Sequence, residues 1–188
     1  MADNTRLGFK SVYPLIVDDN HQSLEVLASI LMGFGINRTQ RADSVESAML
    51  DVRRQAYDFI LVDYEMPVEC GVGLVRCVRD DPSGPNFSTP IIVLSASTPQ
   101  ERVEEVRDAG ANFMIAKPVV PGVLLDRIRW VAHSRRAFVN VDGYRGPDRR
   151  FHTMPLPEGV SERRADQLAL TSVPDKALSQ NEIDEMFT

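Results

Sequence analysis

The sequence predicts an α/β protein in which helices cover both faces of a parallel sheet. Between residues 11 and 134, short apolar segments alternate five times with segments of helical spacing. Residues 59–62 and 91–94 are apolar throughout, as expected of strands with both faces buried. Strands that alternate with helices in this way indicate parallel pairing.

The individual elements follow from local patterns in the same region. The expected strands are, in order, residues 13–17, 36–41, 59–62, 91–94 and 113–116. The expected helices are residues 21–34, a second beginning at Asp43, then 71–79, 98–110 and 121–134. Thr98 is expected to cap the fourth helix, with Pro99 at its first position and Glu101 completing a capping box.

Composition narrows the function classes. The 188 residues suffice for one domain with an extension, and the net charge of -6 argues against general nucleic-acid binding. No apolar run approaches the ~18 residues that a membrane span needs, and residues 1–10 lack the apolar core of a signal peptide. The two cysteines have no histidines nearby and indicate neither a zinc site nor a disulfide framework. We therefore expect a cytoplasmic protein with no membrane partner.

Charged and hydroxyl side chains follow four of the five expected strands. Asp18 and Asp19 come after the first, Asp63 after the third, Ser95 after the fourth and Lys117 after the fifth. Ligands of parallel α/β sheets bind beyond the carboxyl ends of the strands, so these five residues should converge. Taken singly, an aspartate after a strand is often only a turn former or helix cap, and a Lys-Pro pair only a turn. Their joint placement favours a site.

The chemistry of that set points to phosphoryl transfer. Clustered carboxylates repel one another unless a cation joins them, and Mg²⁺ prefers such oxygen ligands. A carboxylate beside the metal can attack phosphorus and form an acyl phosphate. We expect Asp63 to be the nucleophile, with Lys117 as cation and Ser95 as hydroxyl donor to the phosphoryl oxygens.

These residues resemble a known family. The segments Val17-Asp-Asp-Asn20, Val62-Asp-Tyr-Glu-Met-Pro67, Leu94-Ser-Ala96 and Lys117-Pro118, with Gly71 and Gly110-Ala111, are similar to the receiver domain of two-component response regulators, of the chemotaxis-receiver type, over residues 11–134.

The resemblance implies a flavodoxin-like sheet in the order 2-1-3-4-5. It implies that Asp63 accepts phosphate from a histidine kinase or histidine phosphotransfer protein. Mg²⁺ would be held by Asp18, Asp19, Asp63 and the backbone carbonyl of Glu65. Ser95 would be the switch hydroxyl that moves onto the phosphate.

One position departs from the family pattern. Receivers usually have an aromatic residue three positions before the lysine, and its rotamer follows the switch hydroxyl. Met114 occupies that position here, and Phe113 precedes it. Because side chains alternate along a strand, Phe113 should face the opposite side of the sheet. The usual aromatic switch is therefore not expected at this position, although a flexible methionine could still repack.

The remaining chain divides into three expected segments. Residues 1–10 are an N-terminal extension, residues 135–177 an extended or disordered linker rich in Arg, Pro and Gly, and residues 178–188 a short amphipathic helix. Within the linker, Arg145, Arg149 and Arg150 lie among aromatic residues and could grip phosphates. This segment distantly resembles arginine clamps for cyclic dinucleotides. The other interpretation is a basic linker that folds onto the acidic receiver.

The C-terminal segment has the marks of a helix. Ser179 and Glu182 form a capping box, and Leu178 before it pairs with Ile183 as a hydrophobic staple. Its expected partner-binding side chains are Leu178, Ile183, Met186 and Phe187, with Asp184 and Glu185 pointing away. So short a helix is marginal alone but suited to fold on a groove. The segment resembles the N-terminal peptide of the flagellar motor switch protein, which binds the chemotaxis receiver.

The leading hypothesis is a response regulator that signals through protein–protein contacts, in chemotaxis or motility, without a DNA-binding domain. It would catalyse only its own phosphotransfer and dephosphorylation. Its C-terminal helix would contact a downstream protein or its own receiver. Two alternatives remain: an adaptor that binds a cyclic dinucleotide through the arginine segment, and a phosphate sink that only drains a kinase.

Overall fold

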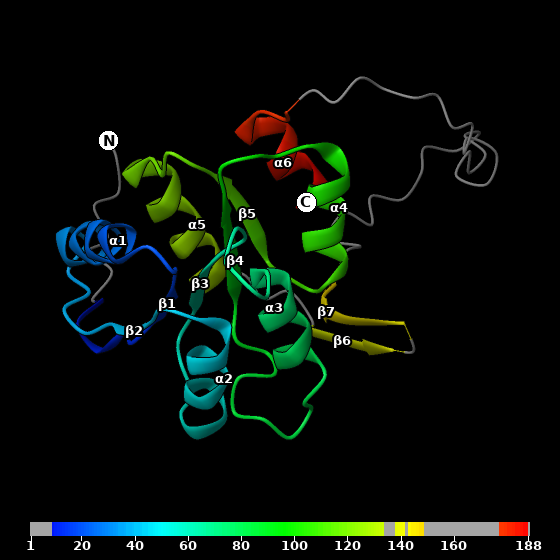
Figure 1. The fold of residues 1–188 in the computed structure, drawn as a ribbon, viewed down its shortest axis with the longest axis horizontal. Helices are drawn as coiled ribbons and strands as arrows, with labels where there is room; N and C mark the ends of the chain where they lie inside the picture. Colours follow the sequence, from blue (N-terminus) through cyan, green and yellow to red (C-terminus); the bar gives the residue numbers. More distant parts are fainter. Residues whose placement is uncertain (1–8, 134–137, 142, 149–176, 188) are drawn as a thin grey trace.

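A five-stranded parallel sheet forms the centre of the structure, a computed structural model that describes residues 9–133, 138–141, 143–148 and 177–187 (Figure 1). The strand order is β2-β1-β3-β4-β5, which confirms the expected topology. The strands are β1 (Leu15–Val17), β2 (Gln40–Ala42), β3 (Ile60–Asp63), β4 (Ile91–Ser95) and β5 (Phe113–Ala116).

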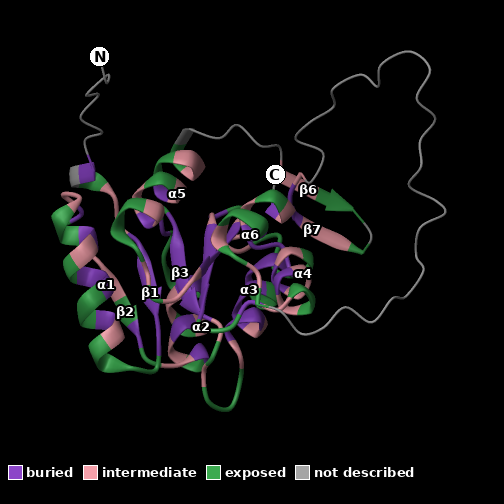
Figure 2. Cartoon of the chain, turned by 90° about the horizontal axis from the view of Figure 1, so that it is seen from above, coloured by how far each residue is buried: buried purple, intermediate pink, exposed green. Residues whose placement is uncertain are grey.

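Helices flank the sheet, with α2 and α3 on one side and α5 on the other (Figure 2). They are α1 (His21–Gly33), α2 (Val45–Arg54), α3 (Gly71–Arg79), α4 (Gln100–Asp108), α5 (Pro121–His133) and α6 (Gln180–Phe187), preceded by the 3₁₀ turn η1 (Phe9–Ser11). None of the helices in the described part of the chain is long and apolar enough to cross a membrane.

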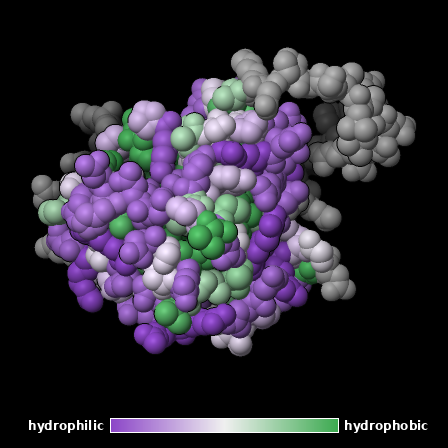
Figure 3. Space-filling model, in the orientation of Figure 1, coloured by the Kyte–Doolittle hydropathy of each residue, from purple (hydrophilic) through white to green (hydrophobic). Residues whose placement is uncertain are grey.

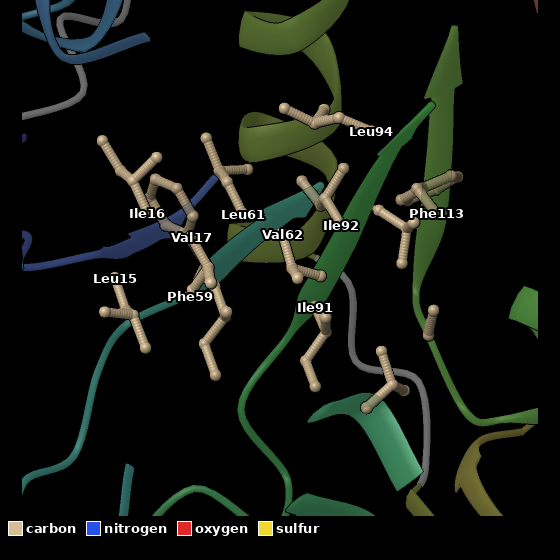
Figure 4. Packing of buried hydrophobic residues seen from close by; sticks show 14 of the residues in the cluster. Leu15, Ile16, Val17, Phe59, Leu61, Val62, Ile91, Ile92, Leu94 and Phe113 are labelled. Carbon is tan, nitrogen blue, oxygen red and sulfur yellow. The ribbon is translucent and has the colours of Figure 1, made fainter. Parts of the chain in front are cut away.

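The core lies on both faces of the three central strands. Every residue of β1, β3 and β4 is buried, and Figure 4 shows aliphatic side chains projecting from these strands, with Phe113 on the neighbouring strand. Each such side chain contributes about 1.5–3 kcal/mol when buried. Large apolar side chains that are exposed, such as Met32, Leu50 and Val68, lie on different elements. The face in Figure 3 is accordingly mostly hydrophilic, with small separate apolar areas.

Three local expectations differ from the structure. The second strand begins at Gln40, four residues later than expected, and Ser44 rather than Asp43 caps α2 by accepting a hydrogen bond from the Ser47 amide. Thr98 does not cap α4, because its hydroxyl donates to the carbonyl of Leu178. A capping pattern in the sequence cannot reveal such a competing acceptor, which lies far along the chain.

The largest difference is a β-hairpin in the expected linker. Strands β6 (Phe138–Val141) and β7 (Tyr144–Pro147) pair antiparallel and turn at Gly143, which has a φ of 89°. The ring of Phe138 packs 4.7 Å from that of Phe87. The hairpin therefore takes its apolar partners from the domain, which explains why residues 135–147 show no strong alternation of their own.

Arg79, the last residue of α3, contacts the hairpin through the Phe138 ring. Its side chain is only 2% exposed, and it donates to the carbonyls of Gly110, Phe87 and Thr89, while its guanidinium lies 5.2 Å from the centre of the Phe138 ring. Burial lowers the pKa of Arg79 to about 10, so the group is still charged at neutral pH. Backbone carbonyls and an aromatic face thus replace water around this cation.

Gly110 allows the hairpin to approach the domain. It has a φ of 95°, and a Cβ atom there would lie 2.2 Å from the carbonyl oxygen of Arg145. Two separate constraints, the backbone conformation and the contact with β7, therefore require glycine at this position.

We predict that Gly110→Ala lowers the free energy of unfolding by more than Gly35→Ala does. Gly35 has a φ of 91° but open space around it, so alanine there should cost only the conformational strain of about 1–2 kcal/mol. Gly110→Ala adds overpacking against β7, worth about 1–3 kcal/mol more. Urea denaturation measures both. Equal losses would mean that the hairpin is not packed against Gly110.

Candidate functional site

Three carboxylates meet at the carboxyl end of the sheet. Asp18 follows β1 and Asp63 ends β3, and the register that pairs Val17 with Val62 brings the two to the same edge. Carboxylate oxygens of Asp18, Asp19 and Asp63 all lie within 4.8 Å of one another. Asp18 and Asp63 are buried, at 0% and 4% exposure, whereas Asp19 faces solvent.

Lys117 neutralises the buried pair. Its Nζ lies 3.1 Å from Oδ2 of Asp18 and 2.8 Å from Oδ1 of Asp63. The residue directly follows β5, and its backbone amide donates to the carbonyl of Ser95 at 2.7 Å. The Lys117–Pro118 peptide bond is cis. The structure thus brings the predicted cation to the predicted carboxylates.

Lys117 does not fully offset the cost of burying the Asp63 carboxylate. Burial raises the pKa of Asp63, Lys117 opposes that effect, and the negative charges of Asp18 and Glu65 add to it, so the net shift is upward. Burial lowers the pKa of Lys117, but its contacts with Asp63 and Asp18 outweigh this and leave it raised. The site therefore carries more negative charge than one ammonium can balance.

The arrangement fits a hard divalent cation. Asp63 Oδ1 is buried and, although near Lys117, has no partner in hydrogen-bond geometry. Asp18 Oδ1 accepts from the Asn20 amide, and Oδ2 faces Lys117. Carboxylate oxygens, one of them without a hydrogen bond, are the ligands that Mg²⁺ takes.

Gly71 fixes the backbone of the same strand end. A Cβ atom at this first residue of α3 would lie 2.0 Å from the carbonyl oxygen of Asp63, and the Gly71 amide donates to the carbonyl of Tyr64 at 3.1 Å. The start of α3 therefore rests on the strand that carries Asp63, and any larger residue would displace it.

Ser95 is bonded away from the three aspartates. Its hydroxyl lies 2.8 Å from Oε1 of Glu65 and 2.7 Å from the carbonyl of Ser97, and it can donate to one of them at a time. Glu65 Oε2 accepts from the Ala96 amide at 3.1 Å. Arg102, in the first turn of α4, forms an ion pair with Glu65 and donates to Ser95 at 3.2 Å and to the carbonyl of Ser97 at 3.0 Å.

Arg102 is the residue of this site that the sequence did not point to. It is 37 residues from Glu65, and its guanidinium also lies 4.2 Å from the centre of the Tyr64 ring. Tyr64 in turn donates its hydroxyl to Glu105 at 2.8 Å. No motif spans these positions, because their meeting depends on the path of the loop between β3 and α3.

Met114 and Phe113 lie on β5 as expected and are both fully buried. Phe113 packs edge-on to Trp130 of α5 at 4.7 Å and lies 6.0 Å from the ring of Phe187. The carbonyl of Met114 accepts a hydrogen bond from the side chain of Gln180. Both residues thus adjoin α6.

Helix α6 contains the predicted capping box, since the Ser179 amide donates to Glu182 at 2.8 Å. Ile183 and Phe187 are buried, and Leu178 and Met186 are half-buried against the core. Asp184 does not point away as expected: it forms an ion pair with Arg127 of α5. A helical wheel places Asp184 beside the apolar face, but it cannot show that Arg127 of another helix lies next to that position.

The arginine segment is described only in part. Arg145 pairs with Asp80 at 2.7 Å, which matches the interpretation of a basic segment folded onto an acidic domain. Arg149 and Arg150 lie outside the described residues.

Comparison with known families decides the identity of the domain. The sequence model described as "Response regulator receiver domain" matches residues 15–129, well over half of the chain. This chain belongs to the response-regulator receiver family. Receivers of this kind are signalling proteins rather than classical enzymes, and the acidic cluster of Asp18, Asp19 and Asp63 is typical of their Mg²⁺ site.

Curated relatives of this receiver include chemotaxis proteins. It is 29% identical over 119 residues to chemotaxis protein CheY-3 of Vibrio cholerae, which spans 63% of this chain and 90% of the relative. It is also 29% identical over 114 residues to chemotaxis protein CheY of Pseudomonas aeruginosa, spanning 61% of this chain and 90% of that protein.

Solved structures agree with the receiver fold. A response regulator of Chloroflexus aurantiacus superposes with a TM-score of 0.61 at 30% identity, covering 65% of this chain and 98% of the other. The receiver domain of a sensor histidine kinase from Pseudomonas aeruginosa, with magnesium coordinated in its active-site cleft, superposes with a TM-score of 0.58 at 30% identity, covering 64% and 98%.

We predict that Asp63→Asn stabilises the receiver in EDTA at pH 7. A carboxylate whose pKa is raised on folding binds its proton more tightly in the folded state, so its ionisation costs stability as pH rises through the folded-state pKa. Thermal unfolding should show a higher midpoint for the variant at pH 7, and the difference should shrink as the pH falls below the raised pKa of Asp63.

Asp19→Asn is the matched control for this prediction, because Asp19 belongs to the same cluster but faces solvent. It should raise the midpoint less than Asp63→Asn does. A lower midpoint for Asp63→Asn at pH 7 would show that the contact with Lys117 outweighs burial.

Proposed function

We propose that this receiver accepts a phosphoryl group on Asp63 and signals through protein–protein contacts. The observation that carries the proposal is the buried carboxylate of Asp63, whose Oδ1 lies 2.8 Å from Nζ of Lys117 and which shares one cluster with two further aspartates. A nucleophile in this position is reachable from the carboxyl edge of the sheet, where ligands of such folds bind.

The transfer would begin with Asp63 ionised. Its Oδ attacks phosphorus of a phosphohistidine, the phosphorus–nitrogen bond breaks, and the imidazole leaves with the electron pair. Lys117, now 2.8 Å from Oδ1, would follow the charge onto the phosphoryl oxygens. A raised pKa for Lys117 keeps it protonated through the reaction.

Mg²⁺ would be held by Asp18, Asp19, Asp63 and the backbone carbonyl of Glu65. When bound, it supplies charge that joins the carboxylates and neutralises the phosphoryl oxygens. Ser95 would serve as the switch hydroxyl. To do so it must leave Glu65 and the Ser97 carbonyl, its present partners, and donate to the phosphoryl group instead.

The partners follow from this chemistry. The phosphodonor is a histidine kinase or a histidine phosphotransfer protein, and the receiver acts in the cytoplasm on a downstream protein. The chemotaxis relatives support a role in chemotaxis or motility. Arg145 is engaged with Asp80, so the alternative of a cyclic-dinucleotide adaptor gains no support from it. A pure phosphate sink would need no output surface, whereas the β5 edge bound by Gln180 of α6 is a candidate for one.

We predict that acetyl phosphate with Mg²⁺ modifies the wild type and leaves Asp63→Asn unmodified. Intact-mass spectrometry at neutral pH, with a hydroxylamine-sensitive product, measures this directly. Asp19→Asn is the control, because it removes a carboxylate of the cluster and keeps the nucleophile; it should slow labelling and not abolish it. Labelling of Asp63→Asn at wild-type level would refute the assignment.

We predict that Lys117→Ala folds and still accepts phosphate but no longer responds to it. The side chain is 24% exposed, and within the described residues its hydrogen bonds and ion pairs are to Asp18 and Asp63, so its removal leaves the apolar core unchanged. Amide exchange of residues 95–98 should change on phosphorylation in the wild type and stay constant in the variant. An unchanged response in Lys117→Ala would remove this residue from the switch.

A further inference from the structure

Helix α6 lies along the open edge of the sheet. β5 is an outer strand, and an outer strand leaves backbone groups without a partner. The side chain of Gln180 pairs with two of them: its Oε1 accepts from the Ala116 amide at 2.8 Å, and its Nε2 donates to the Met114 carbonyl at 2.9 Å. One side-chain amide thus makes the two bonds that a residue of a sixth parallel strand would make.

Other residues on the same face of α6 also contact the domain. Ile183 is fully buried, Phe187 is 5% exposed, and Asp184 pairs with Arg127 of α5. With Gln180, these residues occupy positions i, i+3, i+4 and i+7, which share one side of a helix. Polar bonds to a strand edge, an apolar contact and an ion pair therefore act from a single face.

The same segment also contacts the two stretches of chain that carry Ser95 and Lys117. The Leu178 amide donates to the carbonyl of Thr98, and the Thr98 hydroxyl donates to the carbonyl of Leu178, each at 2.7 Å. Thr98 lies in the loop that begins after Ser95, and Ala116 directly precedes Lys117. Docking of α6 thus fixes the loop that carries the hydroxyl and the strand that carries the cation.

That loop is held in one arrangement. The Ser95 hydroxyl lies within hydrogen-bond distance of Glu65 and of the Ser97 carbonyl, and Arg102 of α4 contacts both of these groups. For Ser95 to reach a group on Asp63, residues 95–98 must rearrange, and their bonds to Leu178 oppose the movement.

We propose that residues 178–187 are an intramolecular ligand of the β5 edge, recognised through Gln180, whose docking closes the surface of β5, α4 and α5 to partners and opposes loading of the acidic site. The proposal rests on the function proposed above and names its regulation. Loading of Asp63 releases α6, and release of α6 favours loading, because a coupling between two sites is reciprocal. The tether keeps α6 at high effective concentration, so a separate partner binds this surface only once α6 has left.

The test compares two matched changes in the full chain. Gln180→Glu keeps the shape of the side chain but removes the donor to Met114. It also places a negative charge beside Asp184, which in the wild type accepts a hydrogen bond from Gln180. Asn181→Asp makes the same amide-to-carboxylate change one residue on, at an exposed position. Binding of beryllofluoride with Mg²⁺, which stands for the phosphoryl group on Asp63, is measured by titration.

Gln180→Glu should bind beryllofluoride about five-fold or more tightly than the wild type, within the usual range of such couplings, and Asn181→Asp should match the wild type. In the wild type, the Ala116 and Leu178 amides should exchange slowly with solvent and speed up on loading. In Gln180→Glu they should exchange quickly from the start, while the Ile92 amide of the central sheet stays protected and shows that the fold is intact.

Two results would overturn the inference. One is equal beryllofluoride affinity in all three proteins; the other is fast exchange of the Ala116 amide in the unloaded wild type. A failure of the proposed function looks different, because then beryllofluoride would bind no better to the wild type than to Asp63→Asn.

Discussion

The carboxylate of Asp63 is almost out of contact with water, and its charge is balanced by an ammonium that arrives from the far end of the sheet. Most of the architecture serves that contact. Parallel register brings Asp18 and Asp63 to one edge, Gly71 lets α3 rest on the Asp63 backbone, and β5 delivers Lys117 to both carboxylates. Because burial raises the pKa of Asp63 even so, the site holds unfavourable negative charge that a bound cation can relieve.

Residues at strand ends could be predicted from the sequence, and residues brought in by loops could not. Strand position alone places Asp18, Asp63, Ser95 and Lys117, since side chains that follow parallel strands share an edge. Arg102 meets Glu65 only because the loop after β3 folds over the site, and no spacing encodes that path. The β6–β7 hairpin was missed for a related reason: its apolar contacts are with Phe87 and Arg79 of the domain, not within its own two strands.

The C-terminal segment shows where local patterns stop being informative. Its capping box and apolar positions were readable, because both depend on helical geometry within a few residues. The role of Gln180 could not be predicted from the sequence, because its side chain bonds a strand edge only where the fold places that edge beside it. The same reasoning applies to Asp184. The sequence alone places its side chain in solvent, but in the structure it forms an ion pair with Arg127.

Helix α4 is secured at both ends by parts of the chain outside the five-stranded unit. Thr98 at its start is bonded to Leu178, and Gly110 after its end touches the backbone of Arg145 in β7. Residues of β7 and of the segment before α6 therefore contact α4 in addition to the receiver fold itself. A fragment cut after α5 would keep the sheet and the acidic cluster, yet it would leave this helix free to choose another tilt. Structures of isolated receivers are for that reason good guides to the acidic cluster of this protein and poor guides to the position of its α4.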